Sequence, residues 1–311
     1  MIEKASLIFM CVLLVGASSL AQTPAEEPQG AEDKVRFWAE RLKSDDQATL
    51  LKAVEKLSRL TYKGTHAPIV NPHLTRLVEL LKHDKTGVKR SVISVLINLK
   101  AKEYTQQIGG LLKDEDDEVK KAAIGALEYF RATDYTGEIA RFLQHRDFGL
   151  RGTAVNALGS FQAKEHAAEI TKLLADENFW VRGLAASALA KLGKEHAKDI
   201  ASLLKSKEND KINAIHALRS LKAKEFAGEI AGLLKDEDHA VRSAALWALR
   251  DFGAKERAGE IAQLLDDKND AVRKEVESML RAWKISPEEA RKAKPEGNPA
   301  GEEKKEAVAA P

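Results

Sequence analysis

The sequence has almost no cysteine: Cys11 is the only one among 311 residues. It lies in an apolar run near the N-terminus that we expect to be removed, so the mature chain would contain no thiol. Disulfide bonds, thiolate metal sites and cysteine nucleophiles are then excluded. Aromatic residues are also scarce, at 5%. A core must therefore be built mainly from alanine, leucine, isoleucine and valine.

The chain also lacks an excess of either charge. Lysine and arginine number 50 against 48 aspartate and glutamate, a formal net charge of +2. Proteins that bind nucleic acid or membrane surfaces usually carry a basic excess, so we expect neither kind of partner. Charged residues of both signs make up 32% of the chain, which is typical of solvated helix faces. No segment alternates apolar and polar residues for long, and we expect no strands.

The N-terminus has the features of a secretory signal. Lys4 precedes an apolar run, Leu7 to Gly16, and small residues at the positions that define cleavage predict cutting after Ala21. We expect residues 1–21 to be a signal peptide and the protein to be secreted or periplasmic. The run is short for a membrane span, although an uncleaved anchor is the alternative. Residues 22–34 contain two prolines and a glycine and are predicted to be a flexible leader.

From residue 35 the sequence repeats every 30 or 31 residues, as six equivalent isoleucines show: Ile108, Ile139, Ile170, Ile200, Ile230 and Ile261. Each copy contains two helical patterns, EIAxLL and VRxxAAxAL, separated by a short polar turn. Two further copies lie upstream, separated by an inserted loop at 61–70. We predict an all-α fold, an open α-solenoid of about eight antiparallel helical hairpins over 35–284. A disordered charged tail, 285–311, is expected to follow.

The pattern xLLxDxxxxVRxxAAxALGxxG resembles HEAT repeats of the phycobilisome-lyase type, best at residues 164–193 and 224–254. The copy at 194–223 departs from it, since Asp210 replaces the usual valine. Proteins with similar repeats include bilin lyases and an iron-dependent hydroxylase that uses His-Glu pairs. This sequence has Glu-His instead, and it shows no nucleophile elbow, phosphate loop or zinc spacing. We therefore expect no catalytic site, no metal and no cofactor.

Helical geometry predicts which residues of each second helix face its neighbours. We number positions from the last leucine of the helix, such as Leu249, which is position 0 and faces the partner helix. Positions −1 and −3 then point sideways, toward the adjoining copies. They are apolar throughout, except that the first copy has Lys56 at −1 and the last has Glu277 at −3. Each charge marks a side without a neighbour, which predicts a finite array and argues against a closed ring.

The remaining positions, −6, −2 and +2, are predicted to line the concave face. They are mostly small and polar, which indicates either close packing of the helices or a groove that admits a partner. Trp247 is the exception, and exposed tryptophan is a common binding anchor. We predict a partner-binding site on this face, made of Trp247, His216, Tyr129, Asn156 and Ser187.

Other recurring side chains have two interpretations each. Arg219, Arg250 and Arg281 occupy position +1 in three successive copies, where they either complement helix C-termini or line the groove edge to grip carboxylates or phosphates. The aromatic residues Phe148, Phe179 and Trp180 either form a second contact surface at the turns or pack against the next hairpin.

Repeated acid–base pairs at a constant spacing predict ion pairs that stabilise the turns: Asp114 with Lys120, Asp176 with Arg182, and Asp236 with Arg242. The function we predict is a non-catalytic scaffold that recognises a protein or peptide through its concave groove. The alternatives are a lyase-like accessory protein or chaperone that handles a chromophore or apolar small ligand, and a purely structural spacer.

Overall fold

The structure, a computed structural model, describes residues 26–64 and 66–293. The predicted signal peptide lies outside these residues. The described part is built from eight successive helical hairpins and two further short helices, and it contains no strand. Within it no helix is both long enough and apolar enough to cross a membrane.

The first helices of the hairpins are short, and from the second hairpin onward they are flanked by 3₁₀ turns, which are frequent at both ends of α-helices. They are α2 (Ala31–Arg41), α5 (Leu74–Glu79), α7 (Thr105–Gly110), α9 (Thr136–Ala140), α11 (Ala167–Lys172), α13 (Ala197–Ala201), α15 (Ala227–Gly232) and α17 (Ala258–Ala262). The second helices are longer. They are α3 (Gln47–Leu60), α6 (Thr86–Asn98), α8 (Asp117–Tyr129), α10 (Phe148–Phe161), α12 (Phe179–Leu192), α14 (Glu208–Ser220), α16 (His239–Phe252) and α18 (Asp270–Trp283).

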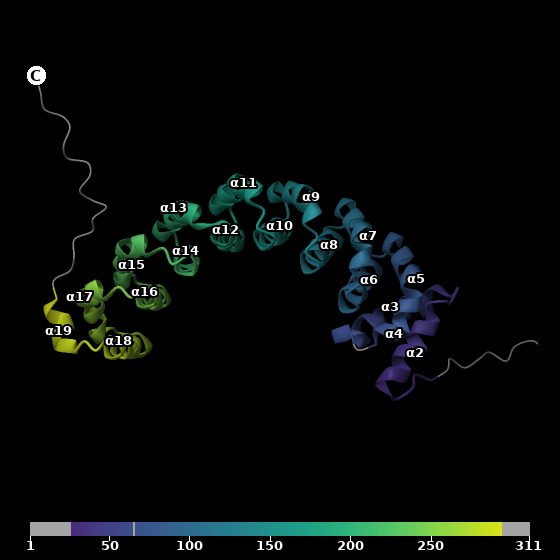
Figure 1. The fold of residues 1–311 in the computed structure, drawn as a ribbon, viewed down its shortest axis with the longest axis horizontal. Helices are drawn as coiled ribbons and strands as arrows, with labels where there is room; N and C mark the ends of the chain where they lie inside the picture. The colour runs from purple at the N-terminus through teal and green to yellow at the C-terminus, as the bar shows by residue number, and fades with distance from the viewer. Residues whose placement is uncertain (1–25, 65, 294–311) are drawn as a thin grey trace, which may run out of the picture.

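The hairpins stack side by side into an open arch (Figure 1). The second helices from α8 to α18 form its inner layer, and the first helices from α7 to α17 form its outer layer. Each second helix packs against the second helices of the adjoining copies. The predicted open α-solenoid of eight hairpins is thereby confirmed, with the second helices on the concave side.

The core follows the predicted positions. Every residue at position −4 is fully buried, from Ala53 and Val92 to Val276. The end charges also lie as expected: Glu277 is exposed, and Lys56 pairs with Glu27 of the preceding segment, at 3.7 Å, rather than with a preceding copy.

Three predicted boundaries differ from the structure. The leader was expected to extend to residue 34, but α2 begins at Ala31. The insertion at 61–70 is largely helical, since it contains a 3₁₀ turn and the short helix α4 (Ala67–Val70). The predicted disordered tail contains α19 (Pro287–Lys292), which packs against α17.

A capping box explains α19. The hydroxyl of Ser286 accepts a hydrogen bond from the backbone N–H of Glu289, whose carboxylate accepts one from the backbone N–H of Ser286. Pro287 is already fixed in a helical φ at the first position, and Ala290 is completely buried. The Ser-Pro-Glu-Glu sequence predicts such a helix start. The prediction of a disordered tail relied on the charged composition of the segment and overlooked this motif.

Candidate binding face

A ladder of ion pairs joins successive hairpins beside the concave layer. The guanidinium of Arg242 donates two hydrogen bonds to the carboxylate of Asp267 in the next copy, both at 2.7 Å. Arg151 binds Asp176 in the same way, at 2.8 Å. Both pairs are buried, with side chains 5–8% exposed. The pairs therefore tie each copy to the one that follows.

This arrangement corrects the predicted pairing inside each turn. Arg242 was expected to pair with the carboxylate of Asp236, but its Nη1 donates instead to the main-chain carbonyl of that residue, at 2.8 Å. Arg182 contacts the carbonyl of Asp176 in the same way, at 2.7 Å. The carboxylates of Asp176 and Asp236 can therefore pair with the preceding copy. Each accepts a hydrogen bond from the backbone N–H of the residue two positions later in the chain, and this bond orients the carboxylate toward the preceding copy.

The same order extends through three more junctions. Lys89 binds Asp114 at 2.5 Å and Lys211 binds Asp236 at 2.7 Å. Burial alone would raise the pKa of Asp236, but the hydrogen bonds from Lys211 and the backbone outweigh it and leave the pKa below its ordinary value. In the irregular sixth copy Asp210, only 3% exposed, accepts from Arg182 at 2.9 Å. The replacement of valine by aspartate therefore keeps the ladder intact where the turn is shorter.

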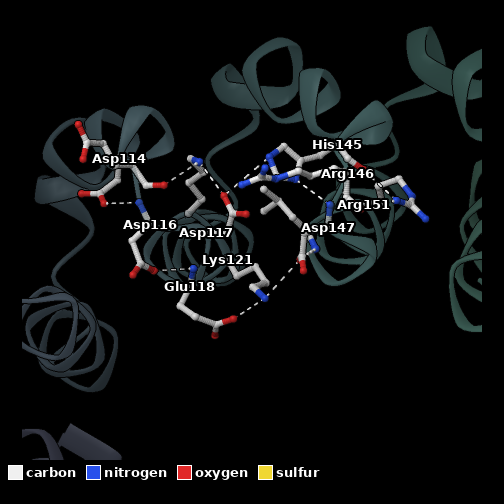
Figure 2. Close-up of polar contacts among 12 residues, drawn as sticks. Asp114, Asp116, Asp117, Glu118, Lys121, His145, Arg146, Asp147 and Arg151 are labelled. Atoms are coloured by element: carbon white, nitrogen blue, oxygen red, sulfur yellow. Dashed lines mark hydrogen bonds and ion pairs between the residues drawn. The ribbon is translucent and has the colours of Figure 1, made fainter.

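The ladder is interrupted between the third and fourth copies (Figure 2). His145 stands where Asp114 and Asp176 stand in other copies, and its Nδ1 accepts the backbone N–H of Asp147 at 3.1 Å. An imidazole completes the turn but offers no carboxylate to the preceding copy. Lys120 therefore binds Asp117 of its own helix, at 2.7 Å, rather than Asp114 as predicted.

On the concave face, the predicted site residues are spread over five helices. Tyr129 lies on α8, Asn156 on α10, Ser187 on α12, His216 on α14 and Trp247 on α16. All except Asn156 are exposed, Tyr129 by 52% and Trp247 by 39%. They share one face but do not form one compact cluster, because neighbouring helices are spaced about 8–10 Å apart.

Two of these residues have defined surroundings. The amide of Asn156 donates to the carboxylate of Glu128 in the preceding copy, at 3.1 and 3.2 Å. The pKa of His216 is lowered, first by partial burial and then by the nearby charge of Arg219. The lowered pKa favours the neutral imidazole, which can take part in hydrogen bonds on this face.

The row of arginines is mostly engaged within the protein. Arg219 binds Asp251 of the next copy at 3.1 Å, and Arg250 binds Glu275 of the next copy at 2.5 Å. Among the described residues Arg281 has no ion-pair partner. The arginines at position +1 thus connect adjacent helices across the concave face. Of the three guanidinium groups expected to be available to a partner, only that of Arg281 is not engaged in an ion pair within the described residues.

The aromatic residues predicted to form a separate surface belong to the same layer. Phe148 and Phe179 are the first residues of α10 and α12, and Trp180 follows Phe179. The rings of Phe148 and Trp180 meet edge to face, 6.4 Å apart. Trp180 leans across to α10, where a Cβ on Gly152 would lie 2.2 Å from the indole ring. It nevertheless remains 44% exposed.

Close packing explains some of the small residues on this face but not all. A Cβ on Gly159 would lie 2.8–2.9 Å from Cβ and Cα of Ala188, so this glycine allows α10 and α12 to approach. Gly125, at position −2 of α8, would meet nothing within 4 Å. Close helix packing therefore explains Gly159, whereas the surface at Gly125 is open and could admit a partner.

A band with a single charged residue crosses the middle of the concave face. By helical geometry, positions −9, −6, −5, −2, +1 and +2 point inward. On α10 and α12 only Lys191 is charged among the residues at these positions: Gly149, Gly152, Thr153, Asn156, Gly159, Ser160, Trp180, Gly183, Leu184, Ser187, Ala190 and Lys191. In a chain with 32% charged residues, this central band is distinct from the rest of the surface.

The fold and this face define a class: an open α-solenoid of helical-hairpin repeats with an exposed concave layer. A sequence model of HEAT repeats matches residues 137–212 and 200–281. The chain therefore contains HEAT repeats, while the phycobilisome-lyase subtype stays a resemblance. A search of curated proteins finds no match.

The crystal structure of an engineered protein is similar over 85% of this chain and 81% of its own, at 20% identity and a TM-score of 0.52. This likeness concerns the fold alone. In the described ranges no group of three or more histidine, cysteine, aspartate or glutamate side chains is placed to hold a metal ion.

Proposed function

We propose that the protein is a non-catalytic scaffold whose concave face binds a protein or a peptide, and that it acts outside the cytoplasm after its signal peptide is removed. One observation carries the first part. Of the large apolar side chains exposed in residues 26–64 and 66–293, all but Tyr62 lie on the second helices: Tyr129, Phe148, Phe179, Trp180 and Trp247.

Such side chains are costly to leave in water and are enriched where proteins bind one another. The central band on α10 and α12, in which only Lys191 is charged, supports the same proposal, since the centre of an interface is usually poor in charged residues. We place the main contact at Trp180 and Phe148, with Trp247 as a second anchor two copies away. An extended partner could contact both along the arch.

The experiment is an affinity capture from native envelope extract after chemical cross-linking, with quantitative mass spectrometry. Trp180→Ala and Trp247→Ala are compared with wild type and with Tyr62→Ala, an exposed aromatic on neither layer of the central arch. The proposal expects specific partners to be lost with the concave variants and kept with Tyr62→Ala. Equal recovery of every partner by all four proteins would reject the concave site.

The second function, a lyase-like accessory protein or chaperone for an apolar ligand, requires a hydrophobic cavity. The structure contains one, but it lies between α5 and α7, away from the exposed concave aromatics. It is considered separately below.

A further inference from the structure

A cavity of about 690 Å³ lies between the first helices of the second and third copies. Apolar side chains form much of its wall, mainly Val78, Leu81, Tyr104 and Leu111. Gly110 also lines it, and a Cβ added there would meet nothing within 4 Å. Its volume is within the range of about 300–1,000 Å³ that small-molecule sites occupy.

The repeat explains why the space is larger at this junction than at the next one, where the pocket between α7 and α9 measures about 320 Å³. One copy later, Tyr135 packs onto α7 at Gly109, where a Cβ would lie 2.1 Å from Cε1 of the tyrosine ring. Tyr104 is the equivalent tyrosine at the α5–α7 junction, but the residue equivalent to Gly109 is Val78. Because the valine side chain occupies the place that the ring would take, the ring cannot pack down in the same way. We attribute the larger volume at the α5–α7 junction to this substitution.

The charges at the rim are unequal. The two carboxylates that line the cavity are already paired: Glu79 with Arg76 at 2.9 Å, and Asp114 with Lys89 at 2.5 Å. Lys82 and Lys113 also line the cavity, and neither has an ion-pair partner among the described residues.

Acidic residues are present next to the cavity. Asp84, Glu115 and Asp116 line an adjoining polar hollow, which Lys113 shares and Lys82 does not. The rim of the cavity therefore prefers an anion most strongly at Lys82. Lys113 lines the same cavity and adds a second positive charge.

We propose that this cavity binds the apolar chain of a free, single-chain anionic amphiphile, such as a medium-chain carboxylate, with its head group at Lys82 and Lys113. The chain replaces water against Val78, Leu81 and Leu111, and the head group provides the anion that the two lysines lack. This site is separate from the concave face and does not depend on the function proposed for it.

The experiment measures binding of decanoate to the purified full-length protein by isothermal titration calorimetry. Gly110→Leu places a branched side chain in the cavity from a position where an added Cβ meets nothing within 4 Å, and Gly232→Leu is its matched control. Gly232 is also the last residue of its helix and is equally open, but it lies in the seventh copy. Gly110→Leu should weaken decanoate binding by about tenfold or more, and Gly232→Leu should leave it unchanged.

Two further comparisons test the chain and the head group. Octanoate should bind roughly tenfold more weakly than decanoate, because it buries two fewer methylene groups. Decyltrimethylammonium should bind more weakly than decanoate to the wild type, and Lys82→Gln with Lys113→Gln should remove that difference. Equal binding by Gly110→Leu and wild type, or by the anion and the cation on wild type, would overturn the proposal.

Discussion

Replacing Asp267 by asparagine tests whether the pairs between copies hold neighbouring hairpins together. The change keeps the shape and an oxygen that can accept the backbone N–H of Asn269, but it removes the charge that faces Arg242. Both side chains of the pair are 5% exposed, and removing one partner of a buried pair costs about 3–5 kcal/mol. The guanidinium keeps its bonds to two main-chain carbonyls, so we expect a loss near the lower end, about 3 kcal/mol.

The measurement combines urea unfolding with native-state hydrogen exchange. In a stack of hairpins each copy contacts only its neighbours, so lost protection should be concentrated in α17, α18 and α19 while α8 to α12 keep theirs. Asp270→Asn is the control, since its side chain is 61% exposed and its pairs are worth about 0–1 kcal/mol. If the two variants lose equal stability, or if protection falls evenly along the array, the reasoning about the ladder is wrong.

Three further substitutions follow from the packing of the helices and from the interruption in the ladder. Gly159→Ala should cost about 1–3 kcal/mol in urea unfolding, because its methyl group meets the backbone of α12, whereas Gly125→Ala should stabilise by up to about 1 kcal/mol. His145→Asp should give Lys120 a carboxylate in the next copy and stabilise the array by about 1 kcal/mol. In thermal unfolding this corresponds to a Tm increase of roughly 2–4 °C.

The sequence provides a control for the histidine. His83 occupies the same turn position two junctions earlier, and its Nδ1 also accepts a backbone N–H. The preceding copy has Leu50 where others have a lysine or an arginine, so His83→Asp should give no increase in Tm. An unchanged or lower Tm for His145→Asp, or an equal gain for His83→Asp, would contradict the ladder as the cause.

The sequence was sufficient for the arrangement of the array. Its period placed Val241, Ala245 and Leu249 on the buried face, and Lys56 and Glu277 at the two ends, because helical geometry alone decides which side chains share a face. Periodicity does not give the rotation between hairpins, and so the partner of Arg242 was sought within its own turn rather than 25 residues later.

The candidate face was predicted less completely. Trp247 was found because it interrupts a row of small residues. Trp180 was assigned to a turn because its pattern did not reveal that α12 begins at Phe179, and helix starts depend on capping contacts such as that of Asn178. The cavity at Val78 could not be foreseen, since it depends on how far apart two short helices lie.

The helix α19 also has a consequence for polymerisation. A stack of hairpins is translationally repetitive, so the end of one molecule resembles the surface on which the next hairpin would add. Contacts of this head-to-tail kind do not close on themselves and can extend into filaments. Ala290 of α19 packs against α17. The helix therefore occupies the surface on which a hairpin of another molecule would continue the stack, and it opposes head-to-tail association.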